Sequence, residues 1–311
     1  MEEPKKTQKP RYAETIRIDV KYIEKLRELL NDLTIEVKKS DNRKVKDFMV
    51  KPRKPGLAPA VIVLHDWWGI NDHVRAVCMQ FAKYGYAAYA PDLFAGNVTD
   101  KLEYAKYMMR QLDPYEVIKT VAIACRKLQS QVFVDPKKIV IMGSMMGGYY
   151  ALFAASRMPE LKAAVSFYGR FPKDVTRETA RIECPVLFFS GQSGDWFEQE
   201  ESRHIEESFI KNRIPAQVVR FEEAPLAFFD DLHLEGYHEP SAQKAWREMV
   251  RFFKEALSEK KGSRFPSLRK RWGALGNSVL DRFEESRMIG RFLDILEEVF
   301  KEDAETSKKR Y

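Results

Sequence analysis

The stretch that decides the fold is Ile139–Ser156, IVIMGSMMGGYYALFAAS. Its first residues are apolar at consecutive positions, which is typical of a strand buried on both faces of a sheet. Three glycines follow, Gly143, Gly147 and Gly148, and then a run of small and apolar residues that predicts a buried helix. A strand, a glycine-rich turn and a helix in this order indicate the sharp turn that raises a nucleophile above a sheet. The residue in the middle of that turn is Met145.

Outward from this turn, short apolar strands alternate with amphipathic helices. This alternation predicts an α/β fold with a doubly wound, mostly parallel sheet. We expect two strands of an N-terminal hairpin at 33–39 and 44–52, and further strands at 60–66, 86–91, 138–143, 163–169, 185–191 and 216–221. Beside the helix of the central turn, we expect helices at 72–83, 102–110, 114–129, 198–211 and 240–257.

Two segments extend this core. We expect residues 1–32 to form an N-terminal extension with an amphipathic helix, 33–257 the α/β domain, and 258–311 a basic linker and a C-terminal amphipathic helix. The apolar stripe of the last helix consists of Ile289, Phe292, Leu293, Leu296, Val299 and Phe300. Such a stripe needs cover, so the helix packs on its own domain, on a second copy of the chain or on another protein. The sequence leaves these three partners open.

Composition narrows the class of protein. Of the 311 residues 44% are hydrophobic and 32% charged, as in soluble globular domains. The N-terminus lacks the apolar run of a signal peptide, so we expect a cytoplasmic protein without a membrane span. Cys78, Cys125 and Cys184 form no CxxC pair, no two histidines have HExxH spacing, and we therefore expect no metal and no cofactor. The net charge of +7 is partly local to the basic stretch 260–271, which favours a solvated linker over a nucleic-acid site.

Several motifs then agree in order and spacing. VIVLHDWWGINDHVRAVCMQFAKYGYAAYAPDLFAG at 61–96, the central turn, AAVSFYG at 163–169 and CPVLFFSGQSGDWF at 184–197 follow one another as in the dienelactone hydrolase family. The resemblance covers Leu33 to Leu257. It implies the α/β-hydrolase fold, and the activity that it implies is the hydrolysis of esters or lactones.

Carried over position by position, the resemblance places the nucleophilic cysteine on Met145, the acid on Asp195 and the histidine on Leu226. The acidic residue beside the nucleophile is Asp66. A thioether has no proton to lose and a leucine cannot accept one, so two members of the triad are degenerate. In this fold the oxyanion would be bound by the backbone N–H of Met146 and one near Trp67.

Three hypotheses follow for the function. The first is a non-catalytic relative that binds a small ligand or a protein partner. An apolar pocket above the turn would be lined by Trp67, Trp68, Tyr168, Phe228 and Phe229. The second is a hydrolase with a non-standard set of residues, drawing on Ser144, His233 or His238. The third is a scaffold that acts through its terminal helices. His65 is expected to be a structural hydrogen-bonding residue, and His73 and His204 to be surface residues of helices.

Overall fold

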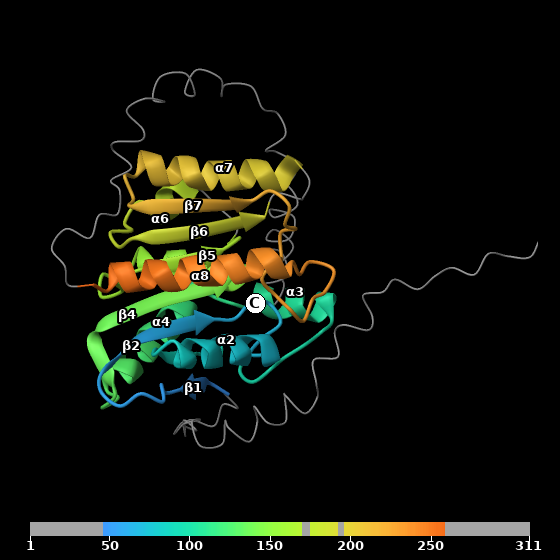
Figure 1. The fold of residues 1–311 in the computed structure, drawn as a ribbon. Coiled ribbons are helices and arrows are strands. Elements are labelled where there is room, and N and C mark those ends of the chain that lie inside the picture. The colour runs from blue at the N-terminus through green and yellow to red at the C-terminus, as the bar shows by residue number, and fades with distance from the viewer. Residues whose placement is uncertain (1–45, 170–174, 192–195, 259–311) are drawn as a thin grey trace, which may run out of the picture.

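A parallel sheet with one antiparallel edge strand forms the centre of the molecule (Figure 1). The computed structural model describes residues 46–169, 175–191 and 196–258. The strands of this part are β1 (Phe48–Val50), β2 (Ala58–Leu64), β3 (Ala87–Ala90), β4 (Val134–Ser144), β5 (Ala164–Phe167), β6 (Val186–Gly191) and β7 (Ala216–Phe221). They lie in the order β1-β3-β2-β4-β5-β6-β7, and only the pairing of β1 with β3 is antiparallel within the described residues.

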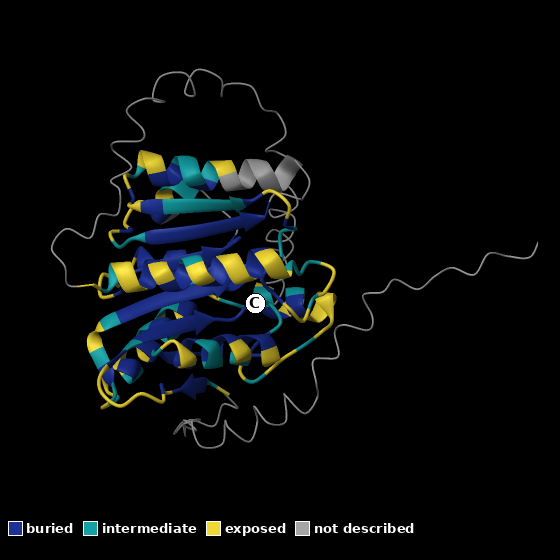
Figure 2. Cartoon of the chain, viewed as in Figure 1, coloured by how far each residue is buried: buried dark blue, intermediate teal, exposed yellow. Residues whose placement is uncertain are grey.

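Helices cover both faces of the sheet. They are α2 (Asp72–Lys83), α3 (Leu102–Arg110), α4 (Pro114–Gln129), α5 (Met146–Ala155), α6 (Val175–Thr179), α7 (Trp196–Lys211) and α8 (Glu239–Ala256). Helices α2 and α8 lie on the face toward the viewer in Figure 1, and α4 and α5 pack on the other face. Figure 2 shows the consequence, a largely buried sheet with exposed residues on the outer sides of α2 and α8. Helix α5 is buried along its whole length.

The sheet separates two hydrophobic cores. Along β2, Ile62 and Leu64 contribute to the core beneath α4 and α5, whereas Val61 and Val63 contribute to the core beneath α2 and α8. Side chains alternate between the faces of a strand, so a strand covered on both sides has to be apolar at every position. The observed packing explains the continuous apolar runs of the sequence and confirms the predicted doubly wound α/β fold.

The predicted bounds of α2, α3 and α4 agree with the structure. Helix α2 begins after Asn71, whose side chain accepts a hydrogen bond from the backbone N–H of Val74, and α4 begins after Asp113, which caps it in the same way and is followed by Pro114. Asparagine and aspartate caps and a proline in the first turn are strong start signals.

Other elements differ from the prediction. Strand β4 begins at Val134 rather than at 138, and the short helix α6 was not predicted. Of the N-terminal hairpin, the second strand is present as β1, and the first, at 33–39, lies outside the described residues. The terminal helices predicted within 1–32 and 258–311 also lie outside them. No helix in the described ranges has both the length and the apolar character required to cross a membrane.

The carboxyl ends of the parallel strands meet at one edge of the sheet. The last paired positions of neighbouring strands are Leu64 with Gly143, Ser144 with Phe167, and Gly191 with Phe221. Helix α8 runs in the opposite direction, so that it starts at this edge and ends at the other (Figure 1). In open α/β sheets, ligands bind outside the carboxyl ends of the strands, and the candidate site lies at this edge.

Candidate functional site

The turn between β4 and α5 has a strained apex. Met145 stands alone between the two elements with φ 50° and ψ −117°, a backbone conformation that residues other than glycine rarely adopt. Its N–H donates a hydrogen bond to the carbonyl of Phe167 at 3.0 Å, and its own carbonyl accepts one from Tyr149 at 3.0 Å. These bonds hold the residue in a conformation that would otherwise relax.

The glycines of this turn allow the close approach of α5 to the sheet. A Cβ atom on Gly147 would lie 2.4 Å from the carbonyl oxygen of Leu64, and one on Gly143 would lie 2.3 Å from the backbone of Gly147. Both distances are shorter than any Cβ contact tolerates, and the obstructing atoms are backbone. The turn therefore has the geometry of a nucleophile elbow, and Met145, the residue predicted to stand at the nucleophile position, is at its apex.

Leu226 lies in the loop that follows β7. The loop passes over the end of β6, because a Cβ atom on Gly191 would meet the carbonyl oxygen of Pro225 at 2.2 Å. Leu226 and Met145 are both half-buried and pack against the same hydrophobic core. Asp195, the predicted acid, lies outside the described residues.

The aromatic residues proposed for an apolar pocket divide into two groups. Trp67 and Trp68 are half-buried and meet edge to face, with ring centroids 5.7 Å apart. Phe228 is fully buried in the hydrophobic core, where its ring lies 4.9 Å from that of Phe221 and 5.6 Å from that of Tyr168. Of these aromatic residues, only the two tryptophans thus keep part of their surface exposed. Met146, whose N–H was predicted to bind an oxyanion, is buried in the first turn of α5.

A group of carboxylates and imidazoles that the sequence did not reveal lies at the same edge of the sheet. We call it the carboxylate–histidine cluster, and it consists of Asp66, His73, Asp230, Asp231 and His233. Nδ1 of His73 donates to Oδ1 of Asp231 at 2.6 Å and lies 3.8 Å from Oδ1 of Asp230. Nδ1 of His233 donates to the other oxygen of Asp230, Oδ2, at 2.7 Å. The Asp230 carboxylate therefore faces both histidines.

The histidine predictions have different outcomes. His65 is fully buried, and both of its ring nitrogens have partners. Its Nδ1 contacts the Asp66 carbonyl at 2.6 Å, and its Nε2 accepts a hydrogen bond from the Leu93 N–H at 3.0 Å. The predicted structural role of His65 is therefore confirmed. The prediction of His73 as a surface residue was wrong, because the residue is only 8% exposed. Its partner Asp231 is 158 positions away in the sequence, and no local spacing signals such a pair. His233 stacks on Trp68 with ring centroids 4.4 Å apart.

Burial and neighbouring charges shift the pKa values in the cluster. Burial raises the pKa of Asp66 to about 7, the charge of Asp230 adds to this effect, and a hydrogen bond from the Trp68 N–H opposes it. Burial alone would lower the pKa of His73, but the hydrogen bond to Asp231 and the surrounding negative charges outweigh it, and the pKa is raised. The same hydrogen bond outweighs burial at Asp231 and lowers its pKa. His73 and Asp231 thus form an ion pair.

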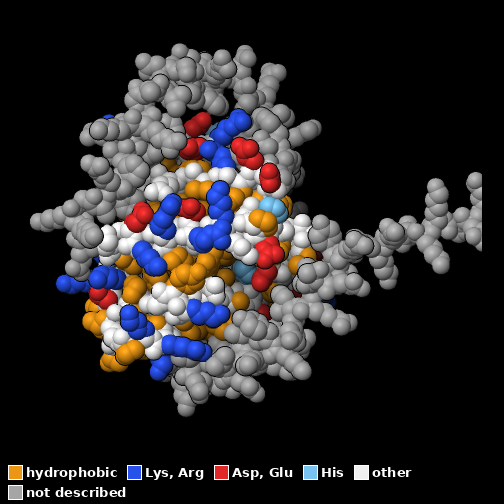
Figure 3. All heavy atoms as spheres, in the orientation of Figure 1, with side chains coloured by type: hydrophobic (Ala, Val, Ile, Leu, Met, Phe, Trp, Pro, Cys, Tyr) orange, Lys and Arg blue, Asp and Glu red, His pale blue; other side chains and the backbone are white. Residues whose placement is uncertain are grey.

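Two surface hollows, each of about 470 Å³, border α8. One lies between α2 and α8 and is lined by His73, Asp231, Phe229 and Trp246, among others. Figure 3 shows the histidine side chains with acidic ones at this end of the face, and further acidic side chains together with lysines and arginines over the rest of it.

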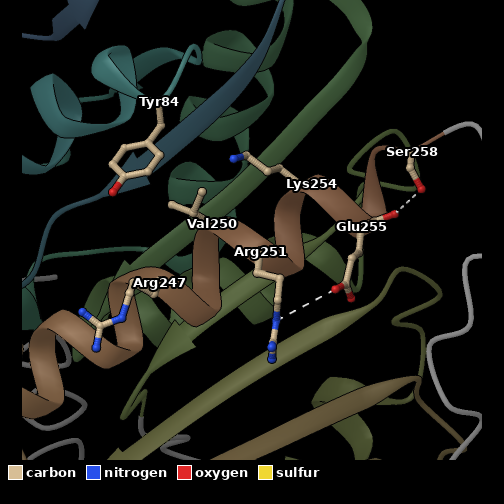
Figure 4. Close-up of a pocket in the computed structure, with 7 residues that line it drawn as sticks. All are labelled: Tyr84, Arg247, Val250, Arg251, Lys254, Glu255 and Ser258. Atoms are coloured by element: carbon tan, nitrogen blue, oxygen red, sulfur yellow. Dashed lines mark hydrogen bonds and ion pairs between the residues drawn. The ribbon is translucent and has the colours of Figure 1, made fainter.

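The other hollow is remote from the elbow. Figure 4 shows its lining of Tyr84, Arg247, Val250, Arg251, Lys254, Glu255 and Ser258. These residues belong mainly to the last turns of α8, at the amino ends of the strands. In this lining, Arg251 Nε lies 3.9 Å from Glu255 Oε1, and both side chains are exposed.

The comparisons with known proteins agree with this geometry. A model of the dienelactone hydrolase family matches residues 45–257. "Protein usf" of Aquifex pyrophilus is 29% identical to this chain over 222 residues, which are 69% of this chain and 95% of the relative. A putative carboxymethylenebutenolidase of Aquifex aeolicus is 28% identical, over 69% of this chain and 94% of the relative. The crystal structure of a putative dienelactone hydrolase from Klebsiella pneumoniae is 25% identical, with a TM-score of 0.63 over 68% of this chain and 92% of that one. The chain belongs to the dienelactone hydrolase family, with the α/β-hydrolase fold.

Proposed function

We propose that this protein is a non-catalytic member of its family, which binds a ligand or partner and does not hydrolyse esters or lactones by the covalent route. The observation that carries the proposal is the methionine at the strained apex of the elbow. Covalent hydrolysis needs a side chain that loses a proton and attacks a carbonyl carbon. The Met145 thioether has no such proton, and its strained backbone is retained without the chemistry that such strain ordinarily serves.

The residue at the histidine position supports the same proposal. Leu226 packs against the hydrophobic core and cannot take a proton from a nucleophile or return one to a leaving group. Losses of the nucleophile and of the base are each sufficient to stop the covalent route, because triad members act as a unit.

Binding is the activity that we propose was retained. The half-buried Trp67 and Trp68 offer rigid aromatic surface at the edge of the sheet where ligands of this architecture bind. A small apolar or aromatic ligand fits this surface best. Fewer aromatic residues are available for this pocket than the sequence suggested, because Phe228 is fully buried in the core.

Steady-state hydrolysis tests the proposal. We expect the full chain to release p-nitrophenol from p-nitrophenyl acetate, and to open a dienelactone, no faster than buffer. The double variant Met145→Cys with Leu226→His restores the thiol and the imidazole, and we expect it to exceed the wild type and both single variants. A wild-type rate well above buffer that survives Met145→Ala would contradict the proposal.

The carboxylate–histidine cluster favours a second candidate, hydrolysis without an acyl intermediate. In this proposal His233, held by Asp230 and stacked on Trp68, accepts a proton from an attacking water. Its signature is a wild-type rate that Met145→Ala leaves intact and His233→Ala abolishes. Ser144→Ala serves as the control for a displaced serine nucleophile, since Ser144 flanks the apex and is buried.

A further inference from the structure

Three ligand atoms of the kinds that transition metals prefer converge at the start of α2. Nδ1 of His73 and one carboxylate oxygen each from Asp230 and Asp231 all lie within 4.8 Å of one another. His73 comes from the first turn of α2, and the two aspartates from the loop between β7 and α8. The side chains of His73 and Asp230 are 9% and 6% exposed, whereas that of Asp231 is 44% exposed.

Asp230 is oriented for such a role. Its Oδ2 accepts the hydrogen bond from His233, and its Oδ1 is the atom that faces His73. Oδ1 also accepts a hydrogen bond from the Leu232 N–H at 3.0 Å, and a carboxylate oxygen has a second lone pair with which it can coordinate a cation. Hydrogen bonds of this kind orient metal ligands. His233 is in turn held by its stacking on Trp68.

Two carboxylates of the cluster, those of Asp230 and Asp231, face the same nitrogen of His73 at 3.8 and 2.6 Å. Buried carboxylates are stable as anions only when they are paired or coordinate a cation. A divalent cation would replace the proton between His73 and Asp231 and would pair with Asp230 as well.

A second, independent observation concerns Tyr168. Its hydroxyl is completely buried and has no hydrogen-bond partner among the described residues. Burial raises its pKa, as do the charges of Asp230 and Asp66, so the hydroxyl is within electrostatic reach of these carboxylates. The N–H of Phe229 opposes this rise but does not reach the hydroxyl in hydrogen-bond geometry. A buried hydroxyl without a partner is the kind of group that a bound water or a hydrated ion satisfies.

The hollow between α2 and α8 provides the route to this position. His73 and Asp231 both line it, and it holds about 470 Å³. A hydrated ion therefore meets two of the three ligands at the wall of an open hollow.

We propose that His73, Asp230 and Asp231 bind one divalent transition-metal ion, of the class of Zn²⁺ or Mn²⁺. One imidazole and two carboxylates suit these borderline cations better than Ca²⁺ or Mg²⁺, which take oxygen ligands only. On binding, the proton that Nδ1 of His73 shares with Asp231 leaves. Tetrahedral ligands of zinc lie roughly 3.4 Å apart, so the half-exposed Asp231 carboxylate moves outward from its 2.6 Å contact.

Calorimetric titration of the full, EDTA-treated chain with Zn²⁺ tests the proposal. We expect one ion per chain, with a dissociation constant of about 10 µM or lower, and binding of Mn²⁺ to the same position by electron paramagnetic resonance. His73→Gln and Asp231→Asn should each weaken Zn²⁺ binding by at least about 100-fold, and His233→Gln by about 10- to 100-fold. Asp231→Asn changes a half-exposed residue and therefore preserves the fold, which circular dichroism verifies.

His238→Gln is the matched control. His238 lies in the same loop, but its Nδ1 pairs with the Ser241 hydroxyl at 2.8 Å rather than with a carboxylate, and its loss should leave the affinity unchanged. All five histidines of the chain are among the described residues, so each has a known place. Failure of the wild type to bind Zn²⁺, or equal affinity in the wild type and both ligand variants, would overturn the proposal. Because the readout is binding, the result is independent of the hydrolysis assay.

Discussion

At the scale of single residues, the elbow and the carboxylate–histidine cluster each contain one residue in an energetically unfavourable state. Met145 has a strained backbone at the apex of the elbow, and Asp66 has a buried carboxyl group whose pKa is raised to about 7. Both states have a cost in folding free energy, and each can be measured by substitution.

Asp66→Asn should remove a pH dependence of stability. The folded protein holds the Asp66 proton up to about pH 7, while the unfolded chain releases it near its ordinary value of 3.8. Stability therefore falls as the pH rises through this window, by an amount on the order of 4 kcal/mol. The asparagine still accepts the Trp68 N–H. Urea unfolding is measured from pH 4 to 8 in the presence of EDTA. The free energy of unfolding of the variant should increase relative to that of the wild type as the pH rises. Parallel curves would mean that Asp230, His73 and His233 compensate fully.

Gly147→Ala should destabilise the protein by about 3 kcal/mol or more, because the added Cβ would meet the carbonyl of Leu64 and the backbone has to shift. Gly85→Ala is the control. It also changes a glycine, one with φ 89°, but the space around it is open, so that only about 1 kcal/mol of backbone strain is expected. Equal losses in the two variants would show that α5 does not depend on its close contact with β2.

At the scale of elements, the N-terminal cap of α2 stabilises the helix and fixes the position of His73. Asn71 ends the loop after β2 and fixes the first turn of α2, in which His73 lies. Asn71→Ala should lower the free energy of unfolding by about 1 kcal/mol through loss of the side-chain cap. Lys101→Ala, at the same position before α3, has no cap bond to lose and should be neutral. Thermal unfolding compares the two, and a similar effect of both substitutions would contradict the role of Asn71.

The same contrast explains what the sequence could predict. Local signals such as the Asp113–Pro114 start of α4 and the apolar run of β2 were sufficient for these elements. The short helix α6 carries no comparable signal. The pairing of His73 with Asp231 requires the loop after β7 to lie against α2. The periodicity of apolar residues predicts helices and strands but not such a contact between distant segments. Residues separated widely in sequence come together only through the sheet.

At the scale of the whole molecule, the family match and the described α/β unit cover nearly the same part of the chain, 45–257 and 46–258 with two short gaps. The division into 1–32, 33–257 and 258–311 stays a prediction, as does docking of the helix predicted at Ile289–Phe300 on a partner. A chain ending at Leu257 should unfold cooperatively, within a few degrees of the full chain, because it keeps all the described residues of both cores. Loss of cooperative unfolding on this truncation would show that residues 258–311 belong to the folded unit.

The central claim is that the elbow cannot form a covalent acyl-enzyme. Intact-mass spectrometry of the full chain, quenched in acid after incubation with excess p-nitrophenyl acetate, tests it directly. Acetylated surface lysines are the background, and peptide mapping assigns them. We predict no acyl group on residues 143–147 in the wild type, whereas Met145→Cys should gain one acetyl group on the new thiol. An acetyl group on the wild-type elbow, at Ser144 or any neighbour, would contradict the account.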